Sequence, residues 1–448
     1  MDKYLFWEGE IIIESINENM LFLYVKKGGK INRNIINETA KEIIFAIDGT
    51  YTLQMIIQSF AQKYNESQKS ISKKIIPFLE ILQEEYEITL LESDYPQKNP
   101  VTIRYANMYP RVVSLEITNR CNIKCLHCYG NFDNTNEEFM PLERVKKLLD
   151  DLNDIGVFII ELTGGECLTH PNFKEILSYA LSLDFVRISI LTNGIALTDT
   201  IMDLIIQNKN RIYVQIDLHS LRDSYLSWFT GACNTLNIIQ RNIRYLADAG
   251  LTMRVATIIT KRNITEMQEI AKWVFDMGIR QYAPSLVIKL GRANFSNTDI
   301  LLDSEEFIEM FNDNVKMINI KFDGIIKLNE NNGFQGANCG CLTSHVAIDT
   351  YGRIKICTMD TLECISTNWG NVFEKRIQEI YDDNQKQFIS FSRIPVPKAD
   401  SKECVGCPKR VFCSSCLLRA FISVKELKDK CKWYQQILTE DMKETLFG

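Results

Sequence analysis

Between about residues 111 and 290, the sequence alternates six times between a strand pattern and a helix pattern. Helical stretches such as Pro141–Leu152, Asn172–Leu183 and Leu236–Ala249 separate short apolar or β-branched runs. These strand candidates are Val113–Ile117, Val157–Thr163, Val186–Thr192, Ile212–Leu218, Met253–Ile259 and Tyr282–Ile288. The repeat predicts an α/β fold with a parallel sheet and right-handed crossovers. In such folds, active groups lie at the carboxyl ends of the strands.

Three cysteines follow the first strand candidate. Cys121, Cys125 and Cys128 are separated by three and then two residues within Leu115–Gly130. Three thiolates at this spacing can hold three irons of a cubane cluster, and no fourth cysteine follows in the loop. A structural zinc site would need four closed ligands, usually in paired CxxC form. The loop therefore favours an iron–sulfur cluster with one open iron.

Composition indicates a reducing compartment for this chemistry. The chain has 448 residues, enough for two or three domains, and 14 cysteines. Its start carries Asp2, Glu8 and Glu10, which does not fit a secretion signal, and we find no apolar stretch of about 18 residues that would span a membrane. So many cysteines without export indicate metal or redox chemistry rather than disulfides, and we expect a cytoplasmic protein.

The cysteine loop, with His127 before its last cysteine, resembles that of the radical S-adenosylmethionine (SAM) superfamily. The resemblance implies a partial (β/α)6 barrel, open on one side, over residues 111–325. It also implies that SAM chelates the open iron of a [4Fe–4S] cluster and that His127 contacts this cofactor. One electron from the cluster would cleave SAM into methionine and a 5′-deoxyadenosyl radical.

Two further segments match the same superfamily. Gly164, Gly165 and Glu166 follow the second strand candidate, where the family grips the methionine amino group. Glycines let the backbone approach a ligand, and a carboxylate suits a cationic amine. Asn193 ends the third strand candidate, where the family approaches the sulfonium and the ribose.

Polar residues on the fourth strand candidate also point to the cofactor. Gln215, Asp217 and His219 alternate with apolar residues, so all three should face into the barrel and find partners there. By resemblance, Asp217 would accept hydrogen bonds from the ribose hydroxyls, Arg254 would face the SAM carboxylate and Gly291-Arg292 would pack the adenine end. For His219, both a core role and a functional role remain open.

The C-terminal region holds nine of the fourteen cysteines, between Cys339 and Cys431. Their arrangement over residues 326–448 resembles the SPASM domain, which binds two auxiliary [4Fe–4S] clusters; a zinc ribbon is the alternative for the CxxC pairs. The resemblance assigns the outer cluster to Cys404, Cys407, Cys413 and Cys431. It assigns the inner cluster to Cys339, Cys357 and Cys416, with Cys341 either a fourth ligand or a bystander. In the second case a substrate thiolate could bind the open iron.

Three other cysteines have no assigned partner. For Cys167, Cys233 and Cys364 we favour the interpretation of buried free thiols, which behave as small hydrophobic side chains.

The first 95 residues predict a separate small domain. Strands are expected at Ile11–Ile13 and Leu21–Val25, followed by three amphipathic helices: one capped by Asn37 and ended by Asp48-Gly49, one through Leu53–Phe60 and one through Ile71–Leu82. Together they predict a winged-helix unit, followed by a linker over 96–110. Residues 1–94 carry 10 Lys/Arg against 15 Asp/Glu, so a nucleic-acid partner is not expected.

Asn37–Ala40 and Ile47–Thr52 in this unit resemble the leader-peptide recognition domain first known from pyrroloquinoline quinone biosynthesis. The resemblance implies that the leader of a ribosomal precursor peptide adds a strand to a sheet edge. Tethering the leader would raise the concentration of the attached core peptide at the active site.

These resemblances lead to one functional hypothesis. The two-residue gap before Cys416 resembles the makers of subtilosin-type sactipeptides, so we expect a radical SAM maturase that forms a sulfur-to-carbon thioether in such a peptide. A flavodoxin- or ferredoxin-type protein would supply electrons, and the inner auxiliary cluster would bind the thiolate and accept the second electron. The alternatives are a carbon–carbon or carbon–oxygen crosslink, epimerisation with Cys233 as a conceivable hydrogen donor, and a non-catalytic iron–sulfur peptide chaperone. The sequence assigns no catalytic residue.

Overall fold

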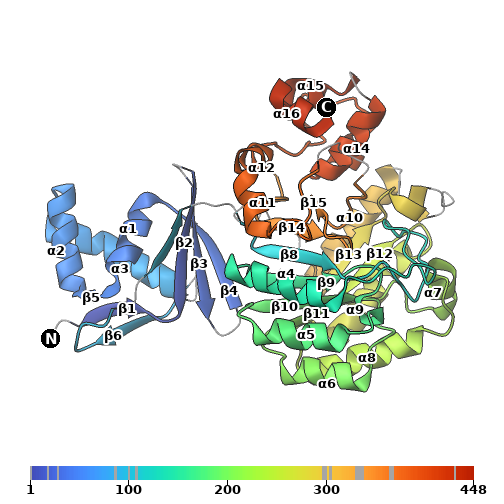
Figure 1. Cartoon of the computed structure of the whole chain (residues 1–448), viewed down its shortest axis with the longest axis horizontal. Coiled ribbons are helices and arrows are strands. Elements are labelled where there is room, and N and C mark those ends of the chain that lie inside the picture. Colours follow the sequence, from blue (N-terminus) through green and yellow to red (C-terminus); the bar gives the residue numbers. More distant parts are fainter. Residues whose placement is uncertain are drawn as a thin grey trace. The chain divides into compact units, whose positions relative to one another are not determined.

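The computed structural model describes most of the chain. The described residues are 3–17, 20–27, 30–84, 88–98, 101–105, 109–294, 300–301, 305–327, 338–362, 368–427 and 430–447. The chain divides into two compact units, Met1–Met108 and Tyr109–Gly448 (Figure 1). Cys364 lies outside the described residues.

The N-terminal unit has two small sheets. In the first, β1 (Tyr4–Trp7) pairs antiparallel with β5 (Asp48–Thr52) and β6 (Leu90–Ser93). In the second, an antiparallel meander is formed by β2 (Glu10–Asn17), β3 (Met20–Lys27) and β4 (Lys30–Ile36), and β7 (Thr102–Tyr105) runs parallel to β2. Only two of these strands were expected, and β7 falls within the segment 96–110 that was expected as a linker. The winged-helix assignment stays a prediction.

The three expected helices are present in this unit. They are α1 (Glu38–Ala46), α2 (Leu53–Tyr64) and α3 (Gln68–Glu84). The Asn37 side chain accepts a hydrogen bond from the Ala40 N–H at 2.8 Å, which satisfies a donor of the first turn of α1. Apolar residues of the three helices and both sheets form one buried cluster, in which the Trp7 indole N–H donates to the Ile44 carbonyl.

The C-terminal unit is built on an eight-stranded sheet, ordered β13-β12-β11-β10-β9-β8-β14-β15. Its six parallel strands are β8 (Val112–Glu116), β9 (Ile159–Thr163), β10 (Arg187–Thr192), β11 (Ile212–Asp217), β12 (Met253–Ile259) and β13 (Tyr282–Leu286). All six expected strands are therefore confirmed, in sequential order, as is the α/β fold with a parallel sheet. β14 (His345–Ile348) extends the sheet parallel to β8, and β15 (Ile354–Lys355) pairs antiparallel with β14.

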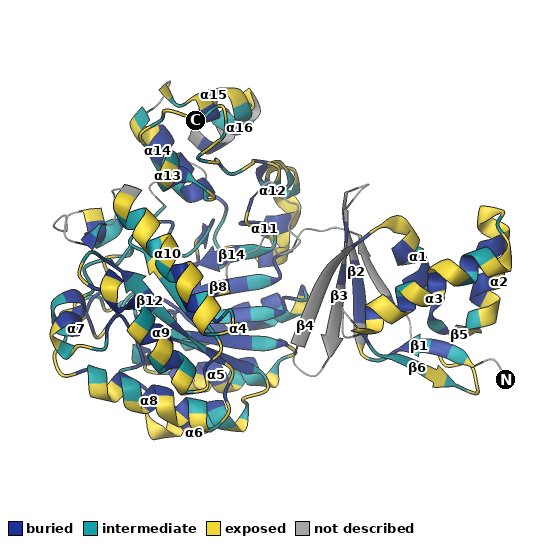
Figure 2. Cartoon of the chain, turned by 180° about the vertical axis from the view of Figure 1, so that it is seen from behind, coloured by how far each residue is buried: buried dark blue, intermediate teal, exposed yellow. Residues whose placement is uncertain are grey.

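Helices separate the parallel strands. The longer ones are α4 (Leu142–Asp154), α5 (Phe173–Ser182), α6 (Asp199–Gln207), α7 (Asp223–Thr230), α8 (Leu236–Asp248), α9 (Met267–Asp276) and α10 (Glu305–Lys321), with short 3-10 turns at Cys167–Thr169, Ile264–Glu266 and Gly291–Asn294. In Figure 2 the strands are largely buried, whereas α6, α8 and α10 carry exposed residues on one side.

The strands are buried on both faces, but the two faces differ in chemistry. In β8, Val113 and Leu115 are apolar and fully buried, and the alternate residues Ser114 and Glu116 are also buried. Successive residues of a strand point to opposite faces, so one face of the sheet is apolar and the other is partly polar. The polar face continues onto the neighbouring strand, because Ser114 of β8 lies opposite Glu161 of β9.

Short helices follow β15 to the end of the described chain. They are α11 (Ile377–Asp383), α12 (Gln385–Ser392), α13 (Arg410–Cys413), α14 (Leu417–Leu427), α15 (Lys432–Ile437) and α16 (Glu440–Phe447). The Thr350 hydroxyl, beyond β14, donates to the Glu116 carbonyl at the end of β8, which joins this region to the parallel sheet. Across the described residues, no helix combines the length and the apolar character that crossing a membrane would require.

Candidate active site

The three loop cysteines line one cavity at the carboxyl ends of the strands. Cys121, Cys125 and Cys128 border a space of about 200 Å³, together with residues from the ends of β9, β10 and β11. Backbone hydrogen bonds fix the loop, because the Cys121 N–H donates to the Asp133 carbonyl at 3.0 Å and the Cys128 N–H to the Cys125 carbonyl at 3.2 Å. The structure thus brings together the thiols that the spacing predicted would act together.

The surroundings of these thiols suit a metal cluster. Burial raises the pKa of Cys121 to about 12, and it raises the pKa values of Cys125 and Cys128 above that of an ordinary thiol. Three mutually repelling thiolates in a buried site need a positive partner, which iron supplies. The donor set therefore fits three ligands of a [4Fe–4S] cluster.

The two glycines after β9 pack against the cysteine loop. A Cβ atom on Gly164, whose φ is +134°, would lie 2.2 Å from the Thr118 carbonyl oxygen, and one on Gly165 would lie 2.3 Å from the Arg120 carbonyl oxygen. The Gly165 N–H donates to Thr118 O at 2.8 Å. Sequence reasoning assigned these glycines to close approach by a ligand; in the structure they also admit the backbone that leads to Cys121.

Glu166 is a buried carboxylate held by three donors. It is 1% exposed, and it accepts hydrogen bonds from the Thr192 hydroxyl at 2.7 Å, the Asn193 N–H at 2.7 Å and the Leu168 N–H at 3.2 Å. Burial raises its pKa to about 7, although these hydrogen bonds oppose the shift. A fixed carboxylate beside the cavity is suited to a cationic amine, as the resemblance implied.

Asn193 connects Glu166 with the cysteine loop. Its side-chain N–H donates to Asn122 Oδ1 at 2.7 Å, and its Oδ1 accepts from the Ile195 N–H. Its side chain also lines the cavity. Asn122 was not singled out from the sequence, although it directly adjoins Cys121, which was.

On β11, Gln215 and Asp217 line the cavity as expected. The Gln215 amide donates to Asp217 Oδ1 at 3.2 Å, and the Arg254 guanidinium donates to Gln215 Oε1 at 2.6 Å. Burial raises the pKa of Asp217 to about 6. Arg254 does not border the cavity and acts here by orienting Gln215, so its contact with a SAM carboxylate stays a prediction.

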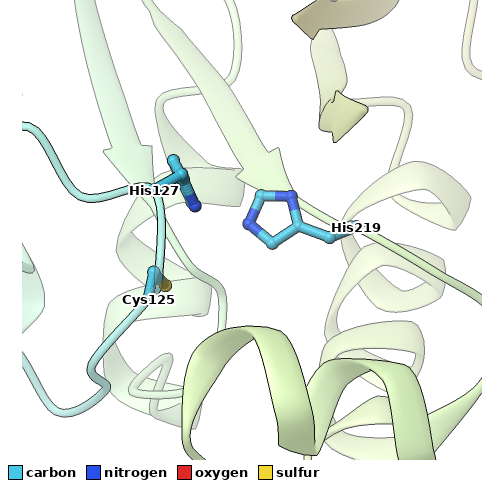
Figure 3. Close-up of side chains that lie close together, drawn as sticks. All are labelled: Cys125, His127 and His219. Carbon is cyan, nitrogen blue, oxygen red and sulfur yellow. The ribbon is translucent and has the colours of Figure 1, made fainter. Parts of the chain in front are cut away.

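His127 and His219 lie side by side next to Cys125 (Figure 3). The His127 ring stacks on Phe229, with centroids 4.8 Å apart, and meets His219 edge-on at 5.2 Å. Burial lowers the pKa of His127 to about 4, so its ring is neutral. His219 does not border the cavity but faces the cysteine loop from the side.

Arg292 contacts the backbone of the cysteine loop. Its guanidinium donates to the Cys125 carbonyl at 2.7 Å and to the Phe132 carbonyl at 3.0 Å, and its N–H donates to the Cys128 carbonyl. A Cβ atom on Gly291 would lie 2.1 Å from the Tyr129 carbonyl oxygen. Gly291-Arg292 therefore clamps the cysteine loop, whereas packing against adenine stays a prediction.

The four cysteines assigned to an outer cluster lie together. Cys404, Cys407, Cys413 and Cys431 line a cavity of about 520 Å³ in the C-terminal region. Burial is the main cause that raises the pKa of Cys413 to about 11, and charge on the other three thiols contributes to this rise. Cys416 does not border this cavity, although it directly continues the same cysteine motif.

Cys416 belongs instead with the inner group. The hydrogen bond with Cys339 and burial raise the pKa of Cys341, and charge on Cys339, Cys357 and Cys416 raises it as well, so these three sulfurs lie within electrostatic reach of Cys341. The Cys341 thiol donates a hydrogen bond to Cys339, which lowers the pKa of Cys339 to about 6. The structure therefore places Cys341 among the three thiols with which the sequence grouped it only as an alternative.

Two of the remaining cysteines differ from each other. Cys167 is fully buried, as expected, with its sulfur 3.4 Å from the Leu191 carbonyl oxygen. Cys233 is exposed, so the interpretation as a buried thiol is wrong for it. It lies two residues after Gly231, the left-handed C-cap of α7, and its side chain is outside the core.

A larger cavity of about 1000 Å³ adjoins the cysteine loop. Tyr129 and Phe132 line both cavities. Burial raises the pKa of Tyr129, and charge on Glu116, Cys128 and Cys357 raises it as well, so the ring lies within electrostatic reach of a loop cysteine and of a cysteine of the inner group. The described residues that line the large cavity include no cysteine, so its link to the cysteine sites is through the ring of Tyr129.

A buried ion pair forms part of the wall of the large cavity. The Lys355 ammonium donates to both oxygens of Glu116, at 2.8 and 2.9 Å, and to the Thr358 carbonyl at 2.9 Å. The Tyr129 hydroxyl also donates to Glu116, at 3.3 Å. Sequence reasoning missed these residues, although a glutamate inside an apolar strand candidate was a signal that could have identified Glu116.

Comparisons with known proteins place this geometry in a family. Residues 115–274 match the model of the Radical SAM superfamily, so this part of the chain is a radical SAM domain. The chain is 28% identical over 415 residues to the antilisterial bacteriocin subtilosin biosynthesis protein AlbA of Bacillus subtilis, with 91% of this chain and 90% of AlbA covered. It is also 25% identical over 201 residues to the sporulation killing factor maturation protein SkfB of the same species, covering 45% of this chain and 48% of SkfB.

Solved structures show the same fold. Streptococcus suis SuiB bound to S-adenosylmethionine superposes with a TM-score of 0.62 at 14% identity, covering 96% of this chain and 98% of SuiB. SuiB bound to its precursor peptide SuiA superposes equally well, covering 95% of this chain.

Proposed function

We propose that this protein is a radical SAM maturase that installs sulfur-to-carbon thioether crosslinks in a ribosomally synthesised precursor peptide. The observation that carries the proposal is the large cavity at Tyr129, which shares Tyr129 and Phe132 with the pocket of the loop cysteines; the Tyr129 ring is also within electrostatic reach of Cys357 of the inner group. Its volume of about 1000 Å³ accommodates a peptide segment. The similarity to AlbA and SkfB, whose names connect them with peptide products, supports the same assignment.

Different residues of the chain would bind different parts of the cofactors. Cys121, Cys125 and Cys128 would hold the SAM-binding [4Fe–4S] cluster, and Glu166 would receive the amino group of SAM. When bound, the cluster and SAM supply the 5′-deoxyadenosyl radical that removes a hydrogen atom from a peptide carbon. Asp217 and Gln215 would orient the nucleoside, and the buried walls of the pocket exclude water from the radical.

A cluster held by the inner cysteine group would serve as the electron acceptor. Thioether formation releases one hydrogen atom, one proton and one electron for each carbon–sulfur bond. Cys339, Cys341, Cys357 and Cys416 lie together, and four thiolates fill the protein-facing positions of a [4Fe–4S] cluster. This grouping favours an inner cluster that accepts the electron without binding the peptide thiolate, and it leaves the outer four cysteines for a third cluster.

The N-terminal unit would hold the leader of the precursor. Its sheets end in the strands β5, β6, β4 and β7, and a strand at a sheet edge presents unpaired backbone groups that an extended peptide can use. The core peptide attached to that leader would reach the large cavity at a raised local concentration. A flavodoxin- or ferredoxin-type protein remains the proposed electron donor.

Anaerobic co-expression with a cysteine-containing precursor, encoded by a small open reading frame beside the gene, tests the proposal. We expect the peptide to lose two hydrogens per crosslink and the crosslinked cysteines to resist thiol alkylation. A product of unchanged mass and altered chirality would establish epimerisation instead. The variant Cys125→Ala is the control, in which the peptide should leave the cell unmodified.

A further inference from the structure

We propose that His219 donates a hydrogen bond from its Nε2–H to the sulfur of Cys125 when the loop holds its cluster, and that this bond raises the reduction potential of that cluster. The sequence left both a core role and a functional role open for His219. The proposed role depends on the radical SAM domain and not on the identity of the peptide.

His219 lies close to the cysteine loop. The ligand atoms of Cys125, His127 and His219 lie within 4.8 Å of one another. Figure 3 shows the His219 ring directed toward Cys125 and His127. The ring nitrogen that is farther from the His219 backbone lies on the side facing these two residues. His219 is buried, with 3% of its surface exposed.

The second observation fixes the tautomer. The Ile258 N–H donates to His219 Nδ1 at 3.2 Å, so Nδ1 is the accepting nitrogen of the ring. In a neutral imidazole the other nitrogen then carries the hydrogen. Nε2 is therefore a donor aimed at the cysteine loop.

The ring is held firmly in this orientation. It meets the rings of His127 and Phe229 edge-on, with centroids 5.2 and 5.1 Å away. Its backbone carbonyl accepts from the Asn263 amide at 2.8 Å, which anchors the residue just beyond β11. Because the ring is already ordered, little conformational entropy is lost when its N–H forms a hydrogen bond with an acceptor.

Two acceptors lie within reach of this donor. His127 Nδ1 is buried and has no hydrogen-bond partner, and the other acceptor is the Cys125 sulfur. A hydrogen bond to a charged acceptor is stronger than one to a neutral nitrogen, so the cluster-bound thiolate is favoured. A purely structural histidine would have both ring nitrogens satisfied within the core.

Hydrogen bonds to cluster sulfurs are among the factors that set the potential of an iron–sulfur cluster. A donor stabilises the more negative, reduced state more than the oxidised state, so its removal lowers the potential. The proposed effect is thus a cluster that a moderate physiological reductant can reduce.

The test uses the full-length, anaerobically purified protein with its clusters. His219→Phe keeps an aromatic ring and removes the donor, whereas His219→Gln keeps a side-chain N–H. The midpoint potential is measured by EPR-monitored titration of the signal that changes when SAM is added. We expect a more negative midpoint in His219→Phe, a midpoint near that of the wild type in His219→Gln, and unchanged iron content in both.

His170 provides a matched control. It is also buried, and its Nε2 is within hydrogen-bonding distance of the Met140 carbonyl, at 2.9 Å, away from the loop cysteines. His170→Phe should leave the midpoint unchanged. An unchanged midpoint in His219→Phe with full iron content, or an equal shift in both phenylalanine variants, would overturn the proposal.

A second measurement covers the case in which His219→Phe loses iron. Pulsed EPR of the reduced protein labelled with 15N-histidine should show an imidazole nitrogen coupled to the SAM-responsive cluster, and this coupling should be absent in His219→Gln. Absence of the coupling in the wild type would refute the hydrogen bond. With the donor removed, SAM cleavage should slow with a moderate reductant and recover with a stronger one.

Discussion

Breaking the ion pair between Lys355 and Glu116 should destabilise the C-terminal unit strongly. The two side chains are 6% and 2% exposed, and Lys355 makes three hydrogen bonds, two of them to Glu116. Substitution Lys355→Met leaves the Glu116 carboxylate buried without its counter-charge. Removing one partner of a buried ion pair costs about 3–5 kcal/mol of unfolding free energy.

The loss should depend on pH in a defined direction. Burial raises the pKa of Glu116, and removal of Lys355 raises it further. A group whose pKa is higher in the folded state loses its stabilising contribution as the pH rises through that pKa. The variant should therefore be most destabilised in mildly alkaline solution and should recover as acidification protonates Glu116.

Urea unfolding followed by tryptophan fluorescence, at several pH values under anaerobic conditions, measures this loss. Lys375→Met is the matched control, because Lys375 pairs with Asp383 at the surface, where both side chains are more than half exposed. The double variant Glu116→Leu/Lys355→Met should regain much of the stability, since it removes both charges. Equal losses in Lys355→Met and Lys375→Met, or a loss that does not change with pH, would refute the reasoning.

Three further predictions concern the two cysteine sites. Glu166→Gln should weaken SAM binding by about 10- to 150-fold, which is the equivalent of a hydrogen bond to a charged group. The SAM affinity of the wild type, measured by equilibrium dialysis, should fall as the pH drops below about 7, because Glu166 then becomes protonated. Gly165→Ala should reduce the iron bound by the loop, because the new Cβ atom would meet a backbone oxygen at 2.3 Å, whereas Gly278→Ala has no atom within 4 Å and should leave iron content unchanged. Cys341→Ser should alter the EPR signal of one auxiliary cluster while SAM cleavage persists; identical spectra would show that Cys341 is a bystander.

The sequence predicted the sheet of the radical SAM domain well because each strand is decided locally. The runs in β8 to β13 are five to seven residues long, are rich in apolar and β-branched residues, and are separated by helical periodicity. The sheets of the N-terminal unit were harder to predict. β5 contains Asp48-Gly49, a pair typical of turns, and it becomes a strand only by pairing with β1 more than 40 residues away.

In the candidate site too, residues with a local sequence signal were predicted, and those that depend on contacts between distant segments were not. Motif residues such as Glu166 and Asp217 were identified because short spacings place them at strand ends. The ion pair of Glu116 and Lys355 joins residues 239 positions apart, so no local pattern indicates it. The tautomer of His219 depends on the N–H of Ile258 in a neighbouring strand, which only the folded chain provides.

The most direct test of the proposed function follows a hydrogen atom from the peptide. The reconstituted protein is incubated anaerobically with SAM, a reductant and a precursor peptide deuterated at its carbon positions. The account predicts one deuterium in 5′-deoxyadenosine for each thioether formed, together with loss of the product and of the label transfer in Cys125→Ala. Unlabelled 5′-deoxyadenosine beside a crosslinked peptide, or a peptide left unchanged while SAM is consumed, would contradict it.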